Sequence, residues 1–285
     1  MPDRGSPTLR RQRLGRELRR LREGADMIGD DVAARLGWSA AKVSRVETAK
    51  TFPTPKDVED LLELYRADRA VRQQLLDLRR GAAQKGWWEE YRAALPPTAM
   101  ALMDREAEAT LARNWEPQVI PGLLQTANYS RALMAAMQPI VQIPHSYIDQ
   151  RVEARMARQQ YLLHGSRPLS FMAVIDESVL RRQFGDAKVM REQLDHLVEI
   201  ADLEHVEMRI LTQETPPPTP TGPFLHLKFP DFPDVVYLEE FFGARFVEDA
   251  EQVFAYERAF QHLLSISLDE AMSQQLIRSI SERWQ

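Results

Sequence analysis

The stretch VAARLGWSAAKVSRVETAK, residues 32–50, holds two short amphipathic segments joined by a glycine. A helix advances about 100° per residue, so the sequence decides which side chains share a face. Val43 and Val46 share one face of the second segment and can pack against three apolar residues of the first, Val32, Ala33 and Leu36. The pattern predicts a helix-turn-helix; the alternative is an ordinary pair of helices in an α-helical core.

The opposite face of the second segment is small, polar and cationic, with Ser39 as the expected N-cap. A major groove about 12 Å wide admits a helix whose leading side chains are short, while a long cation reaches guanine edges or phosphates. Arg45 is therefore the candidate for base readout, and Lys42 the candidate for a contact with the DNA backbone. Ala41 could touch a thymine methyl group, and Ser44 could bind a base or a phosphate. The predicted DNA-binding residues are Ser39, Ala40, Ala41, Lys42, Ser44, Arg45 and Lys50.

The spacing of eight residues in this stretch is more specific: Val32, Ala33, Leu36, Gly37, Ser39, Val43, Ser44 and Glu47. They follow the order LA-x-x-LG-x-S-x-x-x-[IV]-S-x-x-E, and residues from about 14 to 66 thereby resemble the XRE family of bacterial regulators. Two positions depart from the family pattern. Gly29, followed by Asp30 and Asp31, stands where a polar phosphate-binding residue is common, and Ala49 replaces the usual glycine. We expect the two aspartates to cap the helix dipole.

Charge is distributed unevenly along the chain. Residues 1–80 carry 18 Lys and Arg against 13 Asp and Glu, a net charge of +5, while the remainder carries a net charge of −10. This division suits DNA contact by a basic head and a protein partner on an acidic body. Seven arginines near the N-terminus could contact phosphates or form a solvated helix face: Arg10, Arg11, Arg13, Arg16, Arg19, Arg20 and Arg22. A flexible basic arm of Arg4, Arg10 and Arg11 is a further interpretation.

The length of 285 residues exceeds what such a head needs by roughly 200, so a second domain with its own core is expected. We place the boundary near residue 85, giving a DNA-binding domain over residues 1–84 and a regulatory domain over residues 85–285. The chain has no run of about 18 apolar residues and no signal-peptide pattern, so we expect a cytoplasmic protein that does not enter membranes. The absence of cysteine excludes disulfides, thiol catalysis and cysteine-ligated metals.

The second domain reads as helices followed by a mixed region. Proline and glycine turns separate expected helices over about 98–114, 126–137, 144–164, 186–201, 248–264 and 268–283. Short β-like runs begin at Leu169, Val206, Pro223 and Asp234. We expect the aromatic cluster of Trp87, Trp88 and Tyr91 to anchor the junction, and the proline run over 215–223 to form an extended loop. The predicted fold is mainly α with a smaller β component: an all-α helix-turn-helix head and an α+β body.

Several strings of the second domain carry another resemblance: WEPQVIPGLLQTANYSRAL, RVEARMARQQYLL, VIDESVLRR and GPFLHLKFP followed by DVVYLE. They resemble the C-terminal domain of the large actinobacterial, WhiJ-like branch of XRE regulators. The resemblance implies a transcription factor whose C-terminal domain binds a small protein, often encoded beside it, in an arrangement likened to a toxin and antitoxin pair. The segment 243–247 departs from the usual spacing.

An enzymatic function finds little support in the sequence. The six histidines lack metal-ligand spacing, and the chain has no glycine-rich phosphate loop or Gly-x-Ser-x-Gly elbow. The carboxylate pairs Glu239–Glu240 and Asp176–Glu177 follow expected strands, where solvated or capping roles are usual. We expect no catalytic activity, no metal and no cofactor.

The sequence therefore predicts a sequence-specific transcriptional regulator that binds double-stranded DNA as a homodimer on a palindromic operator, with half-sites ~34 Å apart or a multiple of it. Its activity is expected to be controlled by a small protein partner on the C-terminal domain. Two alternatives stay open: an antitoxin-like protein that sequesters a small neighbouring protein and autoregulates, and a regulator that senses a small molecule.

Overall fold

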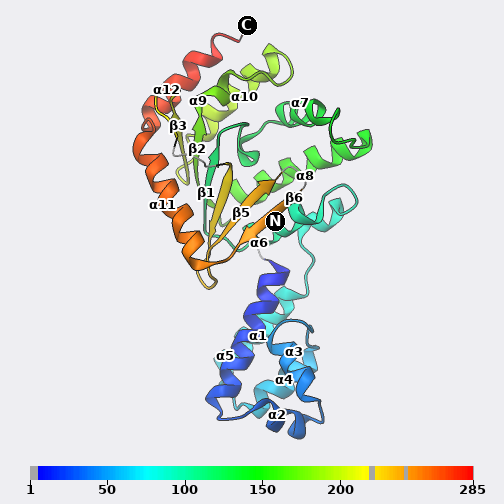
Figure 1. Cartoon of the computed structure of the whole chain (residues 1–285). Helices are drawn as coiled ribbons and strands as arrows, with labels where there is room; N and C mark the ends of the chain where they lie inside the picture. Colours follow the sequence, from blue (N-terminus) through cyan, green and yellow to red (C-terminus); the bar gives the residue numbers. More distant parts are fainter. Residues whose placement is uncertain (1–5, 218–221, 241–242, 285) are drawn as a thin grey trace. The chain divides into compact units, whose positions relative to one another are not determined.

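The structure is a computed structural model that describes residues 6–217, 222–240 and 243–284. The chain divides into two compact units, which we call the head (residues 5–87) and the body (residues 88–285). The prediction placed the boundary near residue 85. Figure 1 shows the elements of each unit.

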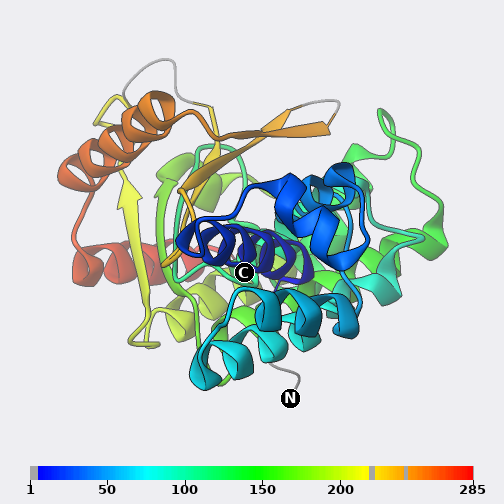
Figure 2. The ribbon, with the colours of Figure 1, turned by 90° about the horizontal axis from the view of Figure 1, so that it is seen from below.

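The described part of the head contains five helices. Their bounds are α1 (Pro7–Gly24), α2 (Gly29–Leu36), α3 (Ala40–Glu47), α4 (Pro55–Leu64) and α5 (Arg69–Ala82). Side chains cap four of these helices, because an oxygen of each N-cap residue accepts a hydrogen bond from a backbone N–H of the first turn: Ser6, Ser39, Thr54 and Asp68. One apolar core joins all five helices, including Leu14, Val32, Val43, Leu61 and Leu75. In Figure 2, α1 lies along α5.

The body contains a six-stranded mixed sheet in the order β3-β2-β1-β4-β5-β6. The strands are β1 (Leu111–Glu116), β2 (Ser170–Asp176), β3 (Val206–Leu211), β4 (Phe224–Lys228), β5 (Val235–Glu240) and β6 (Gly243–Val247). β1, β2 and β3 are parallel, while β4 pairs antiparallel with β1, β5 with β4, and β6 with β5. The sheet order therefore turns at β1, which has a parallel neighbour on one side and an antiparallel neighbour on the other.

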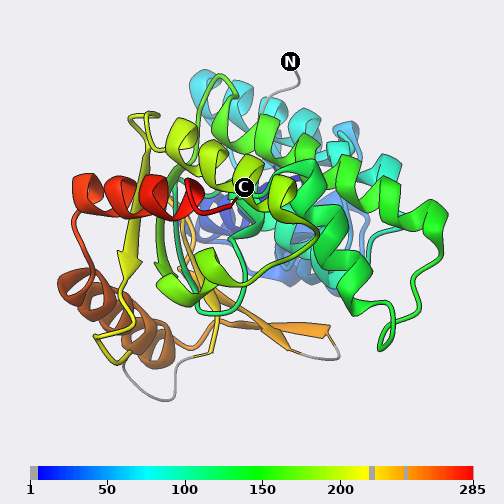
Figure 3. The ribbon, with the colours of Figure 1, turned by 90° about the horizontal axis from the view of Figure 1, so that it is seen from above.

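Helices cover both faces of this sheet. The helices and short 3-10 turns of the body are η1 (Trp87–Tyr91), α6 (Pro97–Glu106), η2 (Gly122–Leu124), α7 (Ala127–Met137), α8 (His145–Leu163), α9 (Glu177–Arg181), α10 (Ala187–Ile200), α11 (Ala250–Ile266) and α12 (Glu270–Ser281). The larger core lies under α7, α8, α10 and α12, and the smaller one lies under α11, where Val253, Phe260 and Leu263 are buried. Figure 3 shows α12, in red, beside α10. No helix among the described residues is long and apolar enough to cross a membrane.

The structure confirms the predicted fold class and corrects three expectations. The helix expected over 98–114 ends at Glu106, and residues 111–116 form β1, because β2 and β4 pair with its backbone on both sides. The sheet has six strands where the sequence suggested four, since β1 and β6 were not predicted. Arg10 and Arg11 belong to α1 and form no arm, while Arg4 and residues 218–221 of the proline run lie outside the described residues.

Candidate nucleic-acid interface

The predicted recognition helix is α3, and buried valines fix its rotation. Val43 and Val46 are only 3% and 2% exposed and belong to the head core together with Val32 and Ala33. Gly37, at the turn before α3, adopts the left-handed region with φ of 67°, which favours glycine. The hydroxyl of Ser39 accepts a hydrogen bond from the backbone N–H of Lys42 at 3.2 Å and caps the helix.

With the valines inward, α3 turns its predicted contact residues outward. Six of the seven predicted DNA-binding residues are exposed: Ser39, Ala40, Ala41, Ser44, Arg45 and Lys50. Among them, only Arg45 and Lys50 carry charge. The short side chains around Arg45 leave the helix surface open to close approach by a large partner.

Lys42 differs from the other six predicted residues, because it is half-buried and held by the head itself. Its Nζ lies 2.7 Å from Oδ1 of Asp57 and 3.5 Å from the centroid of the Trp38 ring. Burial alone would raise the pKa of Asp57, but the ion pair with Lys42 and the hydrogen bonds from Thr54 together outweigh it and lower the pKa. A phosphate contact by Lys42 would therefore compete with Asp57 and Trp38.

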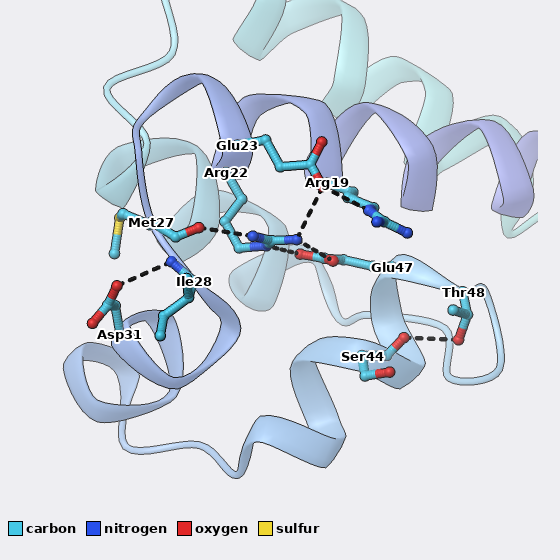
Figure 4. A network of polar contacts seen from close by, with 9 residues as sticks. All are labelled: Arg19, Arg22, Glu23, Met27, Ile28, Asp31, Ser44, Glu47 and Thr48. Atoms are coloured by element: carbon cyan, nitrogen blue, oxygen red, sulfur yellow. Dashed lines mark hydrogen bonds and ion pairs between the residues drawn. The ribbon is translucent and has the colours of Figure 1, made fainter.

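The C-terminal end of α3 is attached to α1 by a bidentate ion pair (Figure 4). Arg22 donates from Nε and Nη2 to the two carboxylate oxygens of Glu47 at 2.7 and 3.1 Å, and from Nη1 to the carbonyl of Met27 at 2.7 Å. The two side chains are only 12% and 9% exposed. A fork of this kind is directional as well as strong, so it fixes the position of α3 against α1. Glu47 belongs to the predicted motif, whereas its partner Arg22 was not predicted.

Gly15 lets α1 approach the end of α3 closely. A Cβ atom at this position would lie 2.5 Å from the carbonyl oxygen of Glu47 and 2.9 Å from that of Val46. No side chain fits there without moving the backbone of α3. The role of Gly15 was not predicted, although a glycine inside an arginine- and leucine-rich helix is a signal of close packing.

The two departures from the family pattern have separate structural outcomes. Ala49, which stands in the place of the usual glycine, adopts φ of 56°, in the left-handed region. At the other departure, the carboxylate of Asp31 accepts a hydrogen bond from the backbone N–H of Ile28 at 3.0 Å, so it acts as the expected cap of α2 (Figure 4).

Several arginines of α1 are engaged within the head. Arg19 pairs with Glu23 at 2.8 Å, and Arg20 pairs with Glu17 at 2.9 Å. Arg11 lies over the ring of Phe52, 4.6 Å from its centroid. These contacts favour the interpretation of a solvated helix face over that of a row of phosphate contacts.

Three of the four carboxylates in the two pairs of the body make structural contacts. Asp176 accepts a hydrogen bond from the backbone N–H of Ser178 at 2.9 Å and caps α9, and Glu177 forms an ion pair with Arg181 at 2.6 Å. Glu240 forms an ion pair with Arg245 at 2.8 Å. Within the described residues, no group of three or more histidines and carboxylates could hold a metal ion.

A helix that is anchored on one face, and that presents short polar side chains and an arginine on the other, defines the helix-turn-helix class of DNA-binding domain. The family model described as "Helix-turn-helix domain" matches residues 13–75, and the model described as "Domain of unknown function (DUF5753)" matches residues 99–279. The chain belongs to the DUF5753 family, with a helix-turn-helix domain at its N-terminal side. No curated protein and no solved structure matches the chain.

Proposed function

We propose that this protein is a sequence-specific transcriptional regulator that binds double-stranded DNA by inserting α3 into the major groove. The observation that carries the proposal is the division of α3 into two faces. Val43 and Val46 are buried, while Ser44 and Arg45 are exposed on a helix that the Arg22–Glu47 pair holds in place.

Each exposed residue of α3 suits a different contact. Arg45 is long enough to donate two hydrogen bonds to a guanine edge, and Ser44 to bind a neighbouring base or phosphate. Ala40 and Ala41 allow close approach and contact with a thymine methyl group. Lys50, beyond the end of α3, suits a phosphate contact, whereas Lys42 reaches DNA only if it leaves Asp57.

The test is selection of bound sites from a pool of random duplexes by the full chain, followed by footprinting. Enrichment of one motif, with protection in the major groove, is the expected result. A second selection with the Arg45→Ala variant should relax the preference at one base pair of each half-site. Recovery of no motif by the full chain would contradict sequence-specific binding.

We further propose that the chain binds as a homodimer to a palindromic operator, with half-sites ~34 Å or a multiple of it apart. A single head offers one short helix, and two heads are needed to read a site of useful length. The footprint should then show two-fold symmetry, and the mass of the protein–operator complex should contain two chains. A complex with one chain would contradict this part of the proposal.

The body would carry the control of this activity, through a small protein partner and without catalysis. The support is the resemblance of the body to WhiJ-like regulators and the net charge of −10 on residues 81–285, which suits a basic partner. Co-expression with the small protein encoded beside the gene should yield a complex that alters operator affinity. The antitoxin-like alternative predicts in addition that the small protein alone is harmful to cells and that this chain neutralises it.

A further inference from the structure

A group of charged side chains gathers at one edge of the body's sheet, where β1 and β5 end. β5 runs in the same direction as β1, because each strand is antiparallel to β4. Asn114 on β1 and Tyr237 on β5 both pair with Leu225 on β4. Glu116 and Glu239 follow two residues later on these strands, so they lie at the same level and on the same face of the sheet, with β4 between them. Their backbones are about 10 Å apart, twice the usual distance between strands.

This edge is a favoured position for ligands in open sheets. The parallel strands β1, β2 and β3 all end here, and the strand order turns at β1. In open α/β sheets, ligands bind beyond the carboxyl ends of the strands at the point where the strand order reverses. Glu116 is the last residue of β1 and thus occupies this point.

Two arginines of α8 lie near this edge, because the charges of Glu239 and Glu116 act on Arg155 and the charge of Glu239 acts on Arg158. Arg158 donates from Nε to Glu106 at 2.7 Å, and the Glu106 side chain is fully buried. Arg155 donates from Nη1 to the side-chain oxygen of Gln125. A Cβ atom on Gly122 would lie 3.1 Å from Nη1 of Arg158 and 3.6 Å from Nη1 of Arg155, so both guanidinium groups approach this glycine.

The two arginines differ in how their charge is neutralised. Glu106 neutralises Arg158 directly, whereas none of the described residues places a carboxylate within ion-pair distance of Arg155. Burial, and the positive charge of Arg158, lower the pKa of Arg155 to about 10, while the charges of Glu239 and Glu116 act in the opposite direction. Arg155 is nevertheless partly accessible to solvent. Each of its side-chain nitrogens either has a hydrogen-bond partner or is accessible to solvent. Its remaining donors therefore face space that solvent can reach.

Glu116 is suited to donate a hydrogen bond in the same place. Burial raises its pKa to about 8, and the carboxylate of Glu239 on β5 adds to this effect. The Asn114 side chain on β1 and the charge of Arg155 on α8 act in the opposite direction, and the Tyr129 hydroxyl on α7 also lies close enough to interact. The raised pKa favours the protonated form of Glu116 near neutral pH, and this form does not repel an anion. Glu239 is exposed.

We propose that Arg155 and Glu116 form a binding site for a small organic anion, in which Arg155 pairs with a carboxylate or phosphate group of the ligand and Glu116 donates a hydrogen bond to it. The carboxyl groups of Glu116 and Glu239 act on Arg155 without forming a direct ion pair with it, and the fork of a guanidinium matches both kinds of oxyanion. The site lies within the body, so it is independent of the proposed DNA contacts of α3.

The first test is an NMR titration of the arginine Nε–H signals of the full chain at pH 6.5. Succinate and inorganic phosphate are the probes, and sodium chloride at equal ionic strength is the control. The Arg155 signal is identified by its absence from the Arg155→Gln spectrum. We expect this signal to shift saturably with succinate, with phosphate or with both. A shift with only one of the two probes shows whether the site binds a carboxylate or a phosphate. The Arg155→Gln variant should bind at least tenfold more weakly, while Arg131→Gln, which removes an exposed arginine of α7, should bind like the parent. No saturable shift with either probe, or full affinity in Arg155→Gln, overturns the proposal.

The second test uses the Glu116→Gln variant, which keeps a neutral donor but no longer titrates. Succinate is mainly the dianion at pH 6.5 and completes its ionisation as the pH rises, which would strengthen binding to a cation, so a loss of affinity towards pH 9 reports on the protein. The parent should lose affinity about tenfold across this range as Glu116 ionises, and Glu116→Gln should keep a constant affinity. A parent affinity that does not depend on pH overturns the role of Glu116. The Arg45→Ala variant should bind succinate normally, so failure of DNA binding and failure of this site are distinguishable.

Discussion

At the scale of single residues, neighbouring side chains of α3 have different roles in the proposed DNA interface. Val46 is buried, its neighbour Arg45 is exposed, and the next residue, Glu47, is bound to Arg22. Three consecutive positions thus serve packing, recognition and anchoring. If α3 were rotated about its axis by one residue, about 100°, Arg45 would be buried and the ion pair of Glu47 would break. The packing of the head therefore fixes the orientation of this helix.

The Arg45→Ala variant should lose ~1 to 3 kcal/mol of specific binding, because a bidentate contact to one base would be absent. Competition gel shifts with the selected operator and with unrelated DNA measure this difference. Arg69→Ala, which removes an exposed arginine at the start of α5, serves as the control and should bind normally. Equal operator affinity for Arg45→Ala and the parent would remove Arg45 from base readout.

The Ala49→Gly variant should stabilise the head by about 1 kcal/mol, because a left-handed φ is costly for alanine and free of steric cost for glycine. Thermal unfolding measures the change. The matched control is Ala34→Gly inside α2, where glycine should destabilise by about 1 kcal/mol. Opposite signs for the two variants are the expected result; destabilisation by both would show that the Ala49 backbone is not strained.

At the scale of elements, close approaches and ion pairs hold the helices in place. Gly15 brings α1 against the end of α3, and Glu257 joins α11 to the sheet. Glu257 accepts hydrogen bonds from Arg113 on β1 at 2.7 Å and from Lys228 on β4 at 3.0 Å. Each of these contacts can be removed without changing the apolar core.

The Gly15→Ala variant should destabilise the head by about 1 to 3 kcal/mol, because its methyl group overlaps the carbonyl oxygens of α3. It should also weaken DNA binding, since α3 has to move away from α1. Gly24→Ala is the control, because a Cβ atom there meets nothing within 4 Å. Denaturant titration and gel shifts measure the two effects. A Gly15→Ala protein as stable as Gly24→Ala would contradict the close approach.

The Glu257→Gln variant should destabilise the body by about 2 kcal/mol at pH 7. This value is smaller than the pKa shift of Glu257 alone would give, because the side chain is 29% exposed and solvent screens its ion pair. Hydrogen bonds from Arg113 and Lys228 lower the pKa of Glu257 to about 2. Its folded pKa lies below the unfolded value, so the stabilisation is present above about pH 4.5 and disappears as the pH falls towards 2. Urea titrations from pH 7 to pH 3 should show the difference from the parent shrinking, whereas Glu251→Gln, an exposed change in the first turn of α11, should show little difference at any pH. A constant difference would contradict the assigned ion pair.

At the scale of the whole molecule, the chain has two units with separate cores, and the helix-turn-helix and DUF5753 matches fall in different units. Damage to one core should therefore be visible separately from damage to the other. The basic excess of residues 1–80 and the acidic excess of the rest also divide along this line.

The Glu47→Gln variant should lower the unfolding temperature of the head alone, because it removes the buried counter-charge of the Arg22 guanidinium. The expected loss is about 3 kcal/mol. Calorimetry of the full chain should show one transition moved and the other unchanged. Glu23→Gln, at an exposed ion pair, should leave both transitions nearly in place. A single transition that moves as a whole would show that the two units unfold together.

Local patterns in the sequence predicted much of this architecture. The spacing of Val43 and Val46 defined the inner face of α3, and the expected cap Ser39 marked the start of this helix. Contacts between distant residues were not predictable in this way. Glu47 meets Arg22 across 25 positions, and β1 is a strand only because β2 and β4 pair with it, although its own residues favour a helix. Lys42 was expected to face DNA, because its ion-pair partner Asp57 lies outside the motif and the pairing was not predicted.

The position of β1 in the sheet has a consequence for biosynthesis. Leu111 pairs with Lys228, so the ribosome must add more than a hundred residues before β1 finds its second neighbour. The head is made of local helical contacts and can fold while the body is still being translated. During that interval one side of the nascent β1 has no partner within the chain, and this is the stage at which a molecular chaperone would be most useful to the protein.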